Sequence, residues 1–189
     1  MKREIIHSII LTVLCIVFFA GFYPMIIWAI AQFSPGKGEG FTTTVNGHKY
    51  YTNIGQKFTG DQYFWSRPSA VDYNAAGSGG SNKGPNDSGY LQLVQARIDT
   101  FQAHNPTIPK NSIPSDLVTA SGSGLDPDIS IKAALVQIPR IAKVRGIKEA
   151  LLLDLINKQQ QQPLASIAGP SKINVLELNL KLDEISKQH

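Results

Sequence analysis

Hydrophobic positions form one long uninterrupted run near the N-terminus and shorter periodic patterns after it. No residue from Ile5 to Phe33 is charged, and most are Ile, Leu, Val, Phe or Ala. A membrane-spanning helix needs about 20 mostly apolar residues, so this run predicts one spanning helix. Pro24 lacks a backbone N–H and should kink that helix near residues 22–23. Gly21, Tyr23 and Pro24 are the positions where we expect it to pack against a neighbour.

The residues on either side of the run indicate whether it is cleaved and how it is oriented in the membrane. Lys2 and Arg3 precede it, and Ala29–Ala31 has the small-x-small pattern of a signal-peptide cleavage site. A signal's apolar region is only about 7–15 residues, so the length favours an uncleaved anchor. Only Lys37 follows before Lys49, and the positive-inside rule therefore places the N-terminus in the cytoplasm. The predicted parts are a cytoplasmic end (1–4), a transmembrane helix (5–33), a linker (34–40) and an extracytoplasmic domain (41–189).

Turn and strand signals are concentrated early in the outer part. β-branched and aromatic residues flank Asn46-Gly47, which predicts a hairpin over residues 41–53. Residues 58–65 predict a further extended piece, and residues 116–120 a short strand. Residues 75–88 are rich in glycine and hold no large apolar side chain, so they predict a long loop.

Apolar residues at helical spacing predict several helices after this loop. The first covers residues 88–104, capped by Asp87 or Ser88. The next opens at Asp126-Pro127, with Ser130 as a second cap, a kink or restart at Pro139 and a stop at Gly146, and a further helix covers residues 147–158.

The last element, residues 174–186, fits two patterns. Alternating leucines suit a strand, whereas spacings of three and four suit a helix, which Asn174 and Glu177 favour as a capping pair. The predicted class is therefore α+β: one N-terminal transmembrane helix, followed by a single domain with a small β-sheet and three to four helices.

Composition narrows the possible partners. Residues 34–189 carry 16 basic and 13 acidic side chains, a balance too mild to predict nucleic-acid binding. The only cysteine, Cys15, lies in the apolar run, so the outer domain depends on its apolar core. A basic stretch with no acid inside it is either a solvated helix face, which we favour, or a contact for an acidic partner or lipid headgroups; its members are Lys132, Arg140, Lys143, Arg145 and Lys148.

The loop Ser78-Gly79-Gly80-Ser81-Asn82 is the strongest candidate for chemistry, as a phosphate cradle, a nucleophile or only a turn. A phosphate-binding loop ends in Lys followed by Ser or Thr, but Lys83 is followed by Gly84-Pro85. No serine has the G-x-S-x-G context, and the four histidines lack metal-ligand spacing. We therefore predict no catalytic, cofactor or metal site and interpret the loop as a turn.

Just before this loop, Tyr63-Phe64-Trp65 and Arg67 form an aromatic segment that we expect to be anchored and partly buried. Arg67 either makes planar contacts to a partner or is an internal structural arginine. Together with the loop 78–82, the segment is our candidate contact surface.

Several motifs in order along the whole chain resemble the KdpC family, the small accessory subunit of bacterial Kdp potassium-transporting ATPases. They include Gly21-Phe-Tyr-Pro24, Gly55-Gln-Lys-Phe-Thr-Gly60, Tyr63-Phe-Trp-Ser-Arg-Pro-Ser-Ala70, Tyr73-Asn74, Ser78-Gly-Gly-Ser-Asn82, Asp116-Leu-Val-Thr-Ala-Ser-Gly-Ser-Gly-Leu-Asp126, Gln137-Ile-Pro-Arg-Ile-Ala142, Gln162-Pro-Leu164 and Asn174-Val-Leu-Glu-Leu-Asn179.

The resemblance implies a complex with KdpA, a potassium-channel-like subunit; KdpB, the P-type ATPase; and KdpF, a small helix. ATP and K⁺ would be handled by the complex, and this chain would not be catalytic itself. Two roles are proposed for the family: a catalytic chaperone that raises the ATP affinity of KdpB, and an assembly element over the potassium entrance of KdpA. The predicted topology favours the second. An anchored cell-envelope enzyme or binding module is the alternative from a different class.

Overall fold

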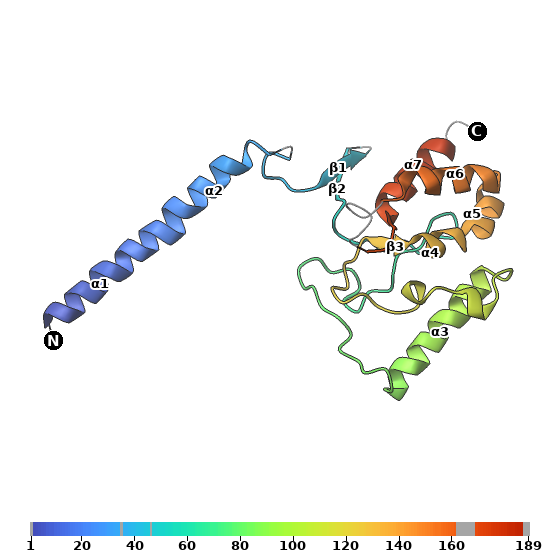
Figure 1. The fold of residues 1–189 in the computed structure, drawn as a ribbon, viewed down its shortest axis with the longest axis horizontal. Coiled ribbons are helices and arrows are strands. Elements are labelled where there is room, and N and C mark those ends of the chain that lie inside the picture. Colours follow the sequence, from blue (N-terminus) through green and yellow to red (C-terminus); the bar gives the residue numbers. More distant parts are fainter. Residues whose placement is uncertain (1, 35, 46, 162–168, 187–189) are drawn as a thin grey trace. The chain divides into compact units, whose positions relative to one another are not determined.

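The computed structural model describes residues 2–34, 36–45, 47–161 and 169–186. The chain forms two compact units, one ending at Tyr51 and the other beginning at Thr52 (Figure 1). Within the described residues the architecture is α+β, with one N-terminal apolar helix, two small antiparallel sheets and several helices, as the sequence predicts.

The first unit begins with the apolar helix. Helix α1 (Lys2–Ile16) continues through a π-helical segment (Val17–Phe22) into α2 (Tyr23–Ala31). The whole stretch is long and apolar enough to cross a membrane. Pro24 lies in the first turn of α2, so the irregularity expected there takes the form of a widened turn just before the proline.

A hairpin completes this unit. Strand β1 (Thr42–Val45) pairs antiparallel with β2 (His48–Tyr51), which confirms the predicted hairpin. Of the two turn residues, Asn46 lies outside the described residues, and Gly47 has a φ of 79°, a conformation that glycine adopts without strain.

The second unit holds five α-helices among its described residues, and their core is apolar. They are α3 (Ser88–His104), α4 (Ile131–Leu135), α5 (Ile138–Arg145), α6 (Glu149–Gln159) and α7 (Val175–Ser186). Helices α5, α6 and α7 lie side by side, with α3 on the other side of the irregular segments that link the elements (Figure 1). Strand β3 (Asp128–Ser130) pairs antiparallel with β4 (Lys172–Asn174), Ile129 opposite Ile173.

Most helix boundaries follow the predicted signals. Asp87 caps α3 by accepting the amide of Tyr90. Pro139 restarts the chain as α5, and Gly146 ends it with a φ of 68°. The helical alternative for residues 174–186 is confirmed, with Asn174 Oδ1 accepting the amide of Glu177.

Three local predictions were wrong. Residues 126–127 do not open a helix, because they lead into β3 and Ser130 makes the cap of α4. The expected strand at 116–120 contains a 3₁₀ turn (Ser115–Leu117) after Pro114, whose fixed φ suits the start of a turn. Residues 58–65 form no strand, because side chains instead of a neighbouring strand satisfy their backbone.

Candidate functional site

Two side-chain amides, one on α7 and one in the turn just before α5, hold residues 60–67, which include the aromatic segment, in place. Asn179 of α7 accepts the amide of Phe64 at 2.9 Å through Oδ1 and donates to the Phe64 carbonyl at 3.0 Å through Nδ2. Gln137 accepts the next amide, that of Trp65, at 2.8 Å. Both carboxamides are buried. Buried backbone groups need hydrogen-bond partners. These two side chains supply the hydrogen bonds that a neighbouring β-strand would otherwise make.

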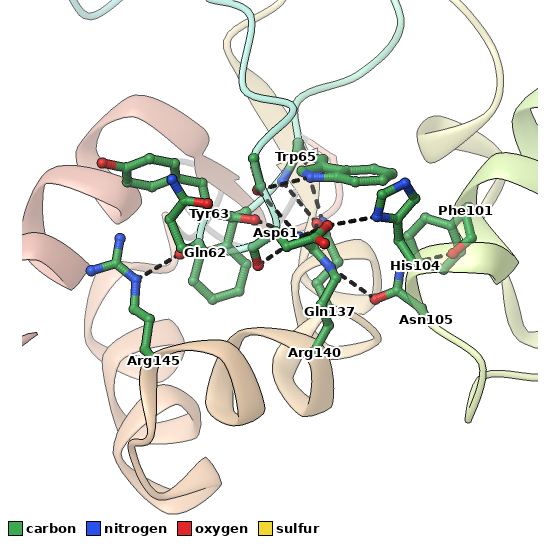
Figure 2. A network of polar contacts seen from close by, with 12 residues as sticks. Asp61, Gln62, Tyr63, Trp65, Phe101, His104, Asn105, Gln137, Arg140 and Arg145 are labelled. Carbon is green, nitrogen blue, oxygen red and sulfur yellow. Dashed lines mark hydrogen bonds and ion pairs between the residues drawn. The ribbon is translucent and has the colours of Figure 1, made fainter.

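Arg140, at the centre of Figure 2, completes this arrangement from α5. Its guanidinium donates to the carbonyls of Gly60, Asp61 and Tyr63 at 3.3, 2.8 and 3.1 Å. It also donates to Asn105 Oδ1 at 3.1 Å and to Gln137 Oε1 at 2.7 Å. We call Arg140, Gln137, Asn105 and Asn179 the arginine network.

The charged guanidinium of Arg140 is buried, and the oxygens that accept its hydrogen bonds are neutral carbonyl and carboxamide oxygens. Burial lowers its pKa to about 10, and the Asp61 carboxylate, 3.6 Å from Nη1, opposes that shift. The group therefore stays protonated at neutral pH. The guanidinium also lies 4.5 Å from the ring centre of Trp65, a cation–π distance. All of these contacts fix the shape of the aromatic segment.

The structure places the aromatic candidates at different depths. Phe64 is fully buried in the core. Tyr63 is partly buried, with its hydroxyl 3.2 Å from Asp183 Oδ2 and Arg145 stacked 4.9 Å from its ring centre. Trp65 is partly buried too, and its indole N–H donates to the Gly60 carbonyl at 3.1 Å. The expectation of an anchored, partly buried segment is confirmed.

Arg67 is paired within the chain. Its Nη1 lies 2.8 Å from Asp126 Oδ2, in an ion pair with both side chains about a quarter exposed. Its carbonyl accepts the hydroxyl of Tyr73 at 2.5 Å. The Nε atom is buried and has no hydrogen-bond partner among the residues that the structure describes. The structural interpretation of Arg67 therefore has direct support, and a contact with a partner stays a prediction.

The glycine loop 78–82 lies against a second glycine loop at residues 121–124. Gly79 N–H donates to the Ser123 carbonyl at 2.9 Å, and the Ser78 hydroxyl donates to the same oxygen at 3.0 Å. A Cβ on Gly80 would lie 3.0 Å from the Gly122 carbonyl oxygen. Glycine here allows two backbones to approach closely.

The remaining candidates are at or near the surface. Ser81 is partly buried, and Asn82 is exposed with a φ of 51°. In the first unit, Tyr23 lies exposed on the apolar helix, and a Cβ on Gly21 would meet nothing within 4 Å. Pro24 is exposed as well. Their packing role stays a prediction.

The preferred interpretation of the basic stretch as a solvated face was wrong for two of its members. Arg140 is buried in the arginine network. Arg145 binds the Gln62 carbonyl at 2.6 Å (Figure 2) and Asp183 Oδ1 at 2.6 Å. Lys132, Lys143 and Lys148 are exposed as expected.

The sequence reasoning missed the network itself, although it left a signal. Asn179 and Gln137 are polar residues at positions where the apolar face of a helix continues, next to Leu178 and Ile138. A carboxamide on a buried face needs hydrogen-bond partners from another segment. Among the described residues, no group of three or more His, Cys, Asp or Glu side chains is placed to hold a metal.

Comparison with known proteins gives one consistent result. A family model described as K⁺-transporting ATPase, c chain (KdpC) matches residues 5–184. The chain is 52% identical to the potassium-transporting ATPase KdpC subunit of Flavobacterium psychrophilum over 97% of this chain and 99% of that one. It is similar to the KdpC subunits of Bacteroides fragilis (42% identity, 98% and 100% covered) and Geobacter sulfurreducens (44%, 98% and 97%).

Proposed function

The chain belongs to the KdpC family of K⁺-transporting ATPase subunits, and on that premise we propose that it is a non-catalytic accessory subunit of the potassium pump. It anchors in the bacterial inner membrane by its N-terminal helix. Its role is the assembly and stability of the channel-like subunit KdpA and the ATPase subunit KdpB, together with the small subunit KdpF. The match over nearly the whole chain is the observation that carries the proposal.

The architecture supports this role. One apolar helix suits an anchor, and buried polar groups of the second unit hold residues 60–67 in one shape. An irregular surface held rigid costs little ordering entropy when a partner binds it. The surface of this chain that we propose to contact KdpA consists of Tyr63, Trp65, Arg67 and the loop 78–82.

We further propose that residues 34–189 lie outside the cytoplasm, so that any effect on the ATP affinity of KdpB is indirect. Such an effect requires that this subunit binds two states of the pump with different affinity. A chaperone in direct contact with ATP would need the opposite orientation.

Labelling of single cysteines tests the orientation. Ser81→Cys and Ser8→Cys, each in a Cys15→Ser background, are treated with a membrane-impermeant thiol reagent on intact spheroplasts. We expect labelling at position 81. Protection at position 81 that disappears on lysis would place the second unit in the cytoplasm and make direct ATP contact the leading mechanism.

Co-purification tests the role. We expect this chain to co-purify with KdpA and KdpB. Two variants, Arg67→Ala and Gly79→Val, should each lower the yield of the complex or its potassium affinity. If both variants leave yield and affinity intact, the contact surface is elsewhere. Activity of the chain alone on a substrate, without co-purification, would instead indicate a cell-envelope enzyme.

A further inference from the structure

A cleft of about 390 Å³ lies between the aromatic segment and α3. Trp65, Phe58, Phe101 and Tyr73 give it an aromatic lining. Figure 2 shows Trp65 beside Phe101 and His104, and the rings of Trp65 and His104 lie 5.0 Å apart. A volume above about 300 Å³ with apolar walls and a few polar groups is typical of a binding site.

The polar group that sets this cleft apart is Arg97 of α3. Its Nη1 donates to the Val118 carbonyl at 3.0 Å, and among the described residues no carboxylate forms an ion pair with it. The other arginines of the second unit each have a carboxylate: Arg67 has Asp126, Arg140 has Asp61 and Arg145 has Asp183. Burial lowers the pKa of Arg97, so its charge is partly desolvated without a counter-ion.

The other charges at the cleft do not supply that counter-ion. Lys57 and Asp72 pair with each other at 2.7 Å, and both are largely exposed. His104 binds Asp61. The cleft therefore keeps one uncompensated positive charge beside aromatic rings, which is complementary to an anion next to an apolar group.

Two residues that line the cleft have a strained backbone conformation. Asp72 and Tyr73 are consecutive non-glycine residues with φ of 49° and 60°, and both line the cleft. Such conformations persist only where the surroundings impose them, and they cluster at ligand sites. Here the Ser69 hydroxyl accepts the amides of Val71 and Tyr73, which holds the strained turn against the cleft.

We propose that this cleft binds an Asp or Glu side chain, with an adjacent apolar side chain, from another subunit of the pump. The inference rests on the proposed function, because it assumes an assembled complex. Arg97 takes the carboxylate, and the rings of Trp65 and Phe58 take the apolar group. The apolar surface continues out of the cleft, because Leu93 is 47% exposed one turn before Arg97 on the same face of α3. An extended chain segment uses that continuation, whereas a free anion does not.

Photo-crosslinking in the assembled complex tests the proposal. A benzophenone side chain replaces Thr100, an exposed residue that lines the cleft, and in a matched variant it replaces Gln92, exposed on another face of α3. We expect position 100 to crosslink to another subunit, through a peptide in which Asp or Glu is next to an apolar residue, and position 92 to crosslink at least tenfold less to that peptide.

Charge variants give the second readout. Arg97→Gln should lower the yield of that crosslink about tenfold or more, since a charge-assisted contact is lost. Arg97→Lys should retain most of it. In the Arg97→Glu variant, the crosslink should return when the Asp or Glu of the crosslinked peptide is replaced by Lys. The melting temperature of each variant, measured on the chain alone, controls for a folding defect.

The proposal is overturned if position 100 crosslinks only to lipid, only within this chain, or to a peptide without a carboxylate. It is also overturned if Arg97→Gln folds normally and crosslinks like wild type. Co-purification of the wild-type chain with KdpA and KdpB is read separately. Its failure would remove the proposed function, whereas intact co-purification with a failed crosslink would remove only this inference.

Discussion

Two arginines have opposite surroundings: Arg140 lies over the ring of Trp65, and Arg97 lines the cleft that Trp65 also lines. Arg140 is buried and donates to five oxygens, three of them backbone carbonyls of the aromatic segment. Arg97 is half-buried, forms one hydrogen bond to a carbonyl and lines an open cleft. An arginine whose donors are saturated by its own chain serves the fold. One whose donors are left over is available to a partner.

The largest effect that we expect from this comparison is a loss of stability when Arg140 is replaced. Arg140→Met should destabilise the second unit by about 3–5 kcal/mol, because it removes the guanidinium hydrogen bonds to the carbonyls of Gly60, Asp61 and Tyr63 and to two side-chain carboxamides. The melting temperature by near-ultraviolet circular dichroism should fall by about 10 °C or more. Lys143→Met, an exposed position on the same helix, is the control and should change stability by about 0.5 kcal/mol or less. Equal melting of the two variants would mean that Arg140 does not organise the segment.

Asn179 should show the next largest effect. Asn179→Leu leaves the N–H and C=O of Phe64 without the Asn179 side chain, which costs about 2–6 kcal/mol if each unsatisfied group costs about 1–3 kcal/mol. Hydrogen exchange of residues 60–67 should accelerate by about 30-fold or more. Asn157→Leu, at an exposed position of α6, should leave exchange in this segment unchanged. Faster exchange throughout the unit, with no excess at residues 60–67, would assign Asn179 a global role instead.

A smaller effect is expected where the two glycine loops meet. Gly124 has a φ of 68°, and a Cβ there would lie 2.7 Å from the Gly79 carbonyl oxygen and from Val71. Gly124→Ala should cost about 1–3 kcal/mol and shift the strained turn that carries Tyr73. Gly122→Ala, where a Cβ meets nothing within 4 Å, is the matched control. Chemical denaturation should separate the two variants, and similar midpoints would show that the loops are not held as described.

The smallest effect is a pH dependence of the cleft wall. Burial raises the pKa of Tyr73 from 10.0 to about 12. Because the folded-state value is the higher one, the stability that Tyr73 contributes is complete below pH 10 and is lost as the pH rises to about 12. The lowered pKa of Arg140 acts in the opposite direction above about pH 10, and comparing wild type with Tyr73→Phe cancels it.

Absorbance titration at 295 nm measures this shift. One late phenol ionisation near pH 12 should disappear in Tyr73→Phe. If all phenols of the wild type ionise together near pH 10, Tyr73 is more exposed than the structure places it.

Local signals in the sequence predicted more than long-range pairing did. Asp87, Pro139, Gly146 and the Asn174–Glu177 pair each fix an element boundary by contacts within four residues, and all four predictions hold. Residues 58–65 resembled a strand because of their aromatic content. Their actual hydrogen-bond partners come from positions 70–120 residues further along the chain.

The two arginines show the same limit at the candidate site. Arg140 looked like part of a basic surface, because the pattern of charges does not show which arginine meets backbone carbonyls. Nothing in the sequence indicated that Arg97 lacks an ion-pair partner among the described residues. Only the three-dimensional arrangement shows that the nearby carboxylates, Asp72 and Asp61, pair with Lys57 and His104 instead. Aromatic residues 63–65 were identified correctly as anchored, because their size alone favours burial.

The distance along the chain between the aromatic segment and its partners sets an order of events during synthesis. Phe64 leaves the ribosome 115 residues before Asn179, an interval of about 6–23 s at bacterial rates of 5–20 residues per second. Until α7 is made, the backbone N–H and C=O of Phe64 lack the Asn179 side chain that they bind in the folded protein. The segment therefore reaches its final shape only after α7 has been synthesised, although Gln137 and Arg140 leave the ribosome earlier.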